Sequence, residues 1–115
     1  MHEYSIIQAL IGRVTEAAEQ RQATRIHRIT VRIGELAGVD ADLLSSAFEL
    51  VRGHSLCAEA ELTINRVAAR WDCAACGRVI EAAMPLCCPT CDEPARLSAG
   101  DEMYLDRIEM EVPDV

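Results

Sequence analysis

The chain has 115 residues, half of them apolar, and its 11 basic and 19 acidic side chains leave a net charge of -8. This length and apolar content suit one ordinary domain, or a modest domain with a small accessory module, and argue against disorder. The negative charge and the four aromatic residues disfavour nucleic-acid binding, which gains affinity by neutralising phosphates and stacking bases.

The sequence contains neither a membrane span nor a secretory signal. No apolar run approaches the roughly 18 to 20 residues of a transmembrane helix, and the first residues lack a charged segment followed by an apolar one. Six cysteines in an unexported chain are expected to bind metal or do redox work rather than form disulfides. We therefore expect a cytoplasmic protein.

The first predicted element is an amphipathic helix over residues 6–21, where apolar side chains recur at helical spacing. Ser5 and Gln8 have the spacing of a capping box, so Ser5 is a candidate N-cap, although the helix can begin two or three residues earlier. The stretch RIHRITVRIGEL then alternates apolar with polar residues and predicts a strand. The alternation places His27 on the buried face, as a structural residue.

A second helix is predicted after the GELAGVD loop. Asp40 can cap its start, and Gly53 is placed to end it. Residues 60–67 and 102–112 follow strand patterns, and the cysteine-rich segment of residues 71–97 lies between them. The order of elements predicts a module inserted between two strands of the main domain. If those two strands pair, the module is tied to the sheet at two points.

The inserted segment contains two C-x2-C motifs, Cys73 with Cys76 and Cys88 with Cys91, separated by eleven residues. Four thiolates from two such turns complete a tetrahedral zinc shell and leave no open position, so the site is structural. A segment this short also needs a metal to fold. Cys87 offers a second register, but only Cys88 has the right spacing to Cys91. Iron, a dithiol redox pair and metal-free thiols are the alternatives.

The amino terminus, MHE, supplies several nitrogens within a few bonds. The Met1 amine, the amides of His2 and Glu3 and the His2 ring are four donors suited to square-planar Ni(II) or Cu(II). The first amides of a helix have no intrahelical partner and can lose a proton to a metal. The alternative interpretation is an ordinary solvated terminus. No H-E-x-x-H motif is present, because Ile6 stands at the second histidine position.

The segments MHEYSIIQAL, VRIGELAGVDADLLSSAFELV and IEMEV, together with the two cysteine pairs, resemble the HypA/HybF family of nickel metallochaperones. The resemblance spans nearly the whole chain in the right order. It implies an α+β fold, with two helices on a three-stranded sheet (residues 1–69 and 99–115) and an inserted zinc ribbon (residues 70–98). Cys87 and the short gap between the cysteine pairs are the departures from the family pattern.

The resemblance also implies a function, which is to bind Ni(II) and deliver it during maturation of nickel–iron hydrogenase, without catalysis. It places nickel at Met1, His2 and Glu3, the last through its backbone or its carboxylate. It places structural zinc at the four paired cysteines. The implied partners are a maturation GTPase and the hydrogenase large-subunit precursor, with urease accessory proteins as a further class. We expect neither nucleic acid nor a membrane as a partner. A zinc-ribbon nucleic-acid module and a thiol redox protein are the rival functions.

Overall fold

The computed structural model describes residues 2–80 and 86–113. The chain divides into two compact units. The first consists of Met1–Arg32, Val39–Asn65 and Tyr104–Val115, and the second of Ile33–Gly38 and Arg66–Met103. The architecture is α+β, as the sequence predicts.

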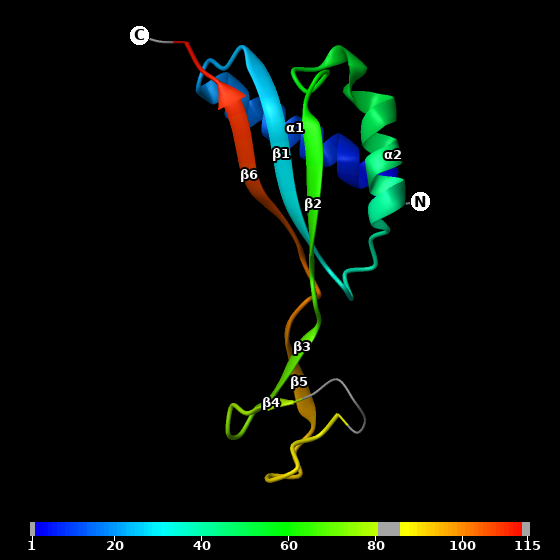
Figure 1. The fold of residues 1–115 in the computed structure, drawn as a ribbon, viewed down its shortest axis with the longest axis vertical. Coiled ribbons are helices and arrows are strands. Elements are labelled where there is room, and N and C mark those ends of the chain that lie inside the picture. The colour runs from blue at the N-terminus through cyan, green and yellow to red at the C-terminus, as the bar shows by residue number, and fades with distance from the viewer. Residues whose placement is uncertain (1, 81–85, 114–115) are drawn as a thin grey trace. The chain divides into compact units, whose positions relative to one another are not determined.

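The first unit contains two helices and most of a three-stranded sheet (Figure 1). Its elements are α1 (His2–Gln20), β1 (Arg25–Gly34), α2 (Ala41–Val51), the short 3-10 helix η1 (Arg52–His54), β2 (Glu61–Val67) and β6 (Met103–Glu111). The strand order β2-β1-β6 places β1 in the centre. The two strands that flank the inserted segment, β2 and β6, therefore do not pair with each other, and they lie on either side of β1.

The apolar faces of both helices and of β1 form the core of the first unit. α1 packs against α2, and its buried residues follow one another at intervals of three or four, as a helix with one core-facing side requires. The core side chains that are fully buried or nearly so are Ile7, Leu10, Val14, Ala18, Ile26, Ile29, Val31, Leu44, Ala47 and Phe48.

The opposite charges of neighbouring strands meet across the sheet. Arg28 on β1 pairs with Glu61 on β2 at 3.0 Å and with Glu109 on β6 at 3.8 Å, and Arg32 pairs with Asp106 on β6 at 3.3 Å. These side chains are all more than a third exposed, so each pair adds less than about 1 kcal/mol. Their main consequence is that the acidic side chains of β6 already have partners.

Three sequence predictions for this unit need correction. α1 begins at His2, three residues before Ser5 and within the earlier start that the sequence allows, so Ser5 lies inside the helix and is not its N-cap. His27 is half exposed and lies 3.3 Å from Glu111, whereas its neighbour Ile26 is fully buried. α2 ends at Val51, because the chain tightens into η1 there, and Gly53 lies within η1. The predicted cap is confirmed, since the Asp40 side chain accepts hydrogen bonds from the N–H groups at positions 42 and 43.

The second unit carries a small antiparallel sheet, with β3 (Arg70–Cys73) between β4 (Val79–Ile80) and β5 (Ala95–Ala99). Its core is minimal. Among the described residues, its buried core cluster consists of Cys73, Ile80 and Cys88, which contact the partly buried Trp71, Cys91 and Ala95. Two of the three buried side chains are therefore thiols rather than hydrocarbons.

The loop that follows β1 is clamped to both chain segments that lead into the ribbon. Glu35 accepts a hydrogen bond from the Ala69 N–H at 2.8 Å, and its own N–H bonds the Val67 carbonyl. On the other side, the Gly34 N–H bonds the carbonyl of residue 102. A Cβ at Gly34 would lie 2.2 Å from the carbonyl of Gly100, so only glycine fits at this approach.

No helix among the described residues is long and apolar enough to cross a membrane.

Candidate metal centres

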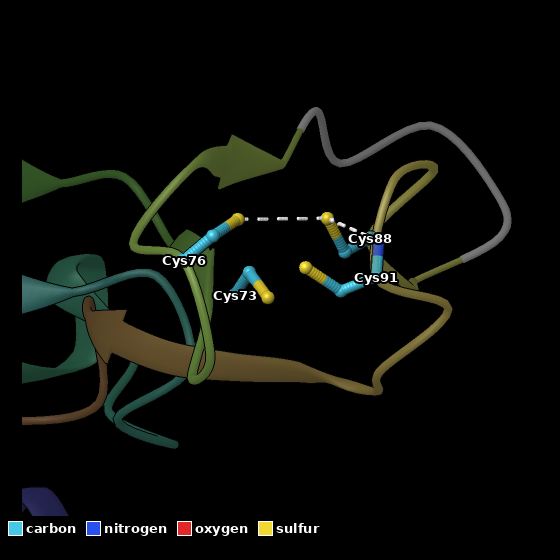
Figure 2. Close-up of side chains that lie close together, drawn as sticks. All are labelled: Cys73, Cys76, Cys88 and Cys91. Carbon is cyan, nitrogen blue, oxygen red and sulfur yellow. Dashed lines mark hydrogen bonds between the residues drawn. The ribbon is translucent and has the colours of Figure 1, made fainter.

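The two C-x2-C motifs meet in the second unit and point their sulfurs toward one another (Figure 2). The Sγ atoms of Cys73, Cys76, Cys88 and Cys91 all lie within 4.8 Å of one another. The Cys76 and Cys88 sulfurs are 3.8 Å apart. Four sulfurs bound to zinc at about 2.3 Å in a tetrahedron would be separated by about 3.8 Å, so the cluster has the dimensions of a four-thiolate zinc site.

The two cysteine turns have the same hydrogen-bond pattern. In the first, the Cys73 carbonyl accepts from the Gly77 N–H at 2.8 Å, and the Cys73 N–H bonds the Arg78 carbonyl at 2.9 Å. In the second, the Cys88 carbonyl accepts from Asp92 at 2.8 Å, and the Cys88 N–H bonds the carbonyl of residue 93 at 2.8 Å. The motif and the two residues after it thus form one structural unit, used twice.

Each turn closes with a residue in the left-handed region, Gly77 at φ 76° and Asp92 at φ 58°. Glycine adopts this conformation freely, and aspartate is one of the few other residues that tolerate it. Backbone N–H groups also point at the first sulfur of each pair, from Ala75 to Cys73 and from Cys91 to Cys88, both at 3.4 Å. Such bonds stabilise a thiolate.

The pKa values of two of the clustered thiols are shifted in opposite directions. The backbone N–H groups of Cys91 and Thr90 lower the pKa of Cys88 to about 7, whereas the sulfur of Cys76 and burial raise the pKa of Cys91 to about 12. The first thiolate to form therefore opposes ionisation of its neighbours. A bound cation removes this conflict, because it attracts all four thiolates at once.

The other two cysteines stand apart from the cluster. Cys87 precedes Cys88 but is not one of the four clustered thiols. Its backbone forms an isolated antiparallel β-bridge with Pro94. Cys57 is fully buried in the first unit, and burial raises the pKa of its thiol. Burial and the raised pKa disfavour the reactive thiolate form of Cys57. The thiol redox alternative, which concerns the paired cysteines, is not favoured, because those four thiols gather in one cluster with the dimensions of a zinc site.

The amino-terminal residues lie beside the start of α2. Met1 falls outside the described residues. His2 is the first residue of α1 and is exposed. Glu3 is 8% exposed, and its Oε2 accepts a hydrogen bond from the Asp40 N–H at 3.1 Å. The N-cap residue of α2 thus holds the start of α1 in place.

The contact between Glu3 and Asp40 joins residues 37 positions apart, and no local sequence pattern predicts it. Asp40 was predicted only as a helix cap, and Glu3 only as a nickel residue. In the structure the backbone N–H of Asp40 donates a hydrogen bond to the Glu3 carboxylate, while the side chain of Asp40 caps α2. The carboxylate of Glu3 is therefore engaged with the protein, whereas the imidazole of His2 is open to solvent.

The fold and the four-sulfur cluster define a metal-binding α+β protein with a zinc-ribbon unit. A family model described as "Hydrogenase/urease nickel incorporation, metallochaperone, hypA" matches residues 1–110. The hydrogenase maturation factor HypA of Wolinella succinogenes is 37% identical over 99% of this chain and 98% of its own. The HypA of Caldanaerobacter subterraneus is 33% identical over 96% of this chain and its own entire length.

Solved structures agree. The solution structure of the Ni metallochaperone HypA from Helicobacter pylori matches with a TM-score of 0.74 and 36% identity, covering 98% of this chain and 100% of that one. A second solution structure of HypA protein matches with a TM-score of 0.78 at 36% identity and covers 96% of both chains. The chain belongs to the HypA family of nickel metallochaperones for hydrogenase and urease nickel incorporation. The nucleic-acid alternative is not favoured.

Proposed function

We propose that this protein binds Ni(II) at its amino terminus and passes it to the precursor of a nickel enzyme, while zinc at the four clustered cysteines holds the ribbon together. The observation that carries the proposal is the position of His2. It is exposed at the first residue of α1, beside an anchored Glu3.

The proposed nickel ligands are the Met1 amine, the amide nitrogens of His2 and Glu3, and the His2 imidazole. Because α1 begins at His2, its first amides have no acceptor within the helix and can be deprotonated without breaking its hydrogen-bond ladder. Nitrogen donors in a plane suit Ni(II). We assign the Glu3 carboxylate a positioning role, because it already accepts the Asp40 N–H.

Zinc suits the cysteine cluster because the four sulfurs have tetrahedral dimensions and no further ligand position is needed. Cys73, Cys76, Cys88 and Cys91 would hold the ion, and its chemistry would be structural. Because four thiolates would fill every ligand position, a competing ligand would have to displace a cysteine before it could bind that metal.

The two sites should therefore exchange metal at different rates. An exposed terminus with few ligands can be attacked by the ligands of a recipient protein, as delivery requires. A closed shell of thiolates cannot be entered in this way. We further propose a cytoplasmic setting, with a maturation GTPase and the hydrogenase large-subunit precursor as partners, and urease accessory proteins as a second class of recipient.

The test is a nickel titration of tag-free, zinc-loaded protein followed by optical absorption. We expect about one Ni(II) per chain with the d–d band of planar coordination. His2→Ala and a variant with one residue added before Met1 should both lose that band. His54→Ala is the matched control, because His54 is also exposed but lies in η1.

Nickel binding should weaken as the pH falls, because protons compete for the amine, the amides and the imidazole. Equal nickel binding by the native chain, His2→Ala and the extended variant would place the ion elsewhere and refute the assignment. Loss of binding in His54→Ala alone would likewise refute it.

A further inference from the structure

β6 forms one edge of the sheet in the first unit, and β2 forms the other. β6 pairs only with β1, so one side of its backbone has no neighbouring strand in the described sheet (Figure 1). β1 buries five of its ten residues, whereas β6 buries none of its nine. Its apolar side chains Leu105, Ile108 and Met110 remain partly open to solvent.

A hollow of about 910 Å³ runs along this edge. Seven of its ten lining residues come from the segment 105–112, and Ala17 and Arg21 of α1 and His27 of β1 complete it. All of these residues belong to the first unit. Val112, at the end of the hollow, is 47% exposed although it is apolar. The hollow thus has a lining of mixed apolar and charged side chains and lies beside unpaired strand backbone.

Of the charged side chains that line the hollow, the two carboxylates are in ion pairs with arginines elsewhere on the sheet. Asp106 pairs with Arg32, and Glu109 pairs with Arg28, both across the sheet. Arg21 and Arg107 are exposed, and within the part of the chain that the structure describes neither takes part in an ion pair. The hollow therefore offers two free cations on a protein whose net charge is -8.

We propose that the edge of β6 and the adjoining hollow form a docking surface (the β6 edge) for an extended, acidic segment of a partner protein. The segment would add a fourth strand to the sheet, with main-chain hydrogen bonds to β6. Its apolar side chains would cover Leu105 and Met110, and its carboxylates would meet Arg21 and Arg107. A second copy of this chain fits less well, because antiparallel pairing of two β6 edges around their centre brings Arg107 close to its own counterpart.

The experiment uses the zinc-loaded full chain and three labelled peptides of the length of β6. One alternates valine with glutamate, the second replaces glutamate with lysine, and the third keeps the acidic sequence but carries N-methyl groups on alternate residues. N-methylation removes the donors that strand pairing needs while leaving the charge unchanged. Amide NMR shifts and fluorescence anisotropy report the place and the strength of binding.

We expect the acidic peptide to bind, with shift changes concentrated in β6 and in the last turns of α1. The lysine and N-methyl peptides should not bind. Arg107→Glu should weaken binding by about three- to tenfold, as expected for an exposed ion pair turned into a repulsion. Arg13 is an exposed residue of α1 that does not line the hollow. Arg13→Glu makes the same charge change there and should leave binding within about twofold.

Four results would overturn the proposal. They are no binding of the acidic peptide, shift changes outside the β6 edge, equal binding of the lysine peptide, and concentration-dependent self-association of the protein that alone protects the β6 amides. Because no step requires nickel, failure here would leave the proposed nickel function intact, and failure of the nickel titration would leave this surface intact.

Discussion

The two units of this protein are stabilised by different means. The first unit buries ten or more apolar side chains between two helices and a sheet, so its fold needs no metal. In the described part of the second unit, the core cluster has three buried residues, and two of them are the cysteines that begin the two cysteine turns. A metal held by these cysteines would be part of the core of the second unit, whereas a metal at the amino terminus would be added to a fold that is already complete. This difference is the basis for assigning a structural metal to the second unit and a transported metal to the amino terminus.

The largest expected effect is the loss of the second unit when its metal site is broken. Cys88→Ser, or removal of zinc with a chelator, should abolish the dispersed amide NMR signals of residues 66–103, because structural zinc in small modules contributes about 10–16 kcal/mol. The helical circular dichroism of the first unit should remain. Cys87→Ser is the control and should leave the spectrum unchanged. A fully dispersed spectrum from zinc-free protein would show that the second unit folds without its metal and would contradict this prediction.

The first unit should respond instead to loss of apolar packing. Phe48 is 1% exposed, and Phe48→Ala should reduce the free energy of unfolding of the first unit by about 3–5 kcal/mol. Thermal unfolding followed by circular dichroism measures this change. Zinc should remain bound at one per chain in the folded variant. Loss of zinc and of helical signal at the same lowered temperature in Phe48→Ala would show that the two cores are not independent.

A smaller effect is expected at the clamp between the β1 loop and the ribbon segments. Gly34→Ala places a Cβ against the Gly100 carbonyl and should destabilise the protein by about 1–3 kcal/mol. Gly12→Ala is the matched control, because a Cβ there meets nothing within 4 Å and should raise helix stability by about 0.5–1 kcal/mol. Chemical denaturation of both variants gives the comparison, and equal stability would show that the clamp is dispensable.

A change of similar size is expected at the anchor of the amino terminus. Glu3→Ala removes the acceptor of the Asp40 N–H and should cost about 1–3 kcal/mol, while Glu3→Gln retains an acceptor oxygen and should cost less. If the carboxylate only positions the terminus, Glu3→Gln should also keep the nickel band. Loss of nickel in Glu3→Gln with unchanged stability would instead identify the carboxylate as a ligand.

The sequence predicted the features that depend on local pattern. The Asp40 cap and the three strands of the main sheet were visible as periodicity or spacing. His27 was misplaced because a strict alternation was assumed, whereas the structure buries Ile26 before the alternation of Ile29 and Val31 begins. The error at Ser5 arose because a capping-box pattern also fits residues inside a helix.

The missed features are contacts between distant segments. Glu3 reaches Asp40 across 37 positions, and Glu35 reaches the Ala69 N–H across 34. Gly34 looked like an ordinary loop glycine, yet its role is to admit the Gly100 backbone. Composition and periodicity contain no information on such approaches, because they are set by tertiary packing.

The central claim is that zinc completes a core while nickel is carried at the terminus. The most direct test is to add one equivalent of Ni(II) to zinc-loaded, tag-free protein and follow its amide NMR signals. Planar Ni(II) should perturb the start of α1 and the Asp40 cap, leave the two cysteine turns unchanged, and have no effect on His2→Ala. Perturbation of the cysteine turns, or the same response from His2→Ala, would show that nickel enters the ribbon site and would contradict the account.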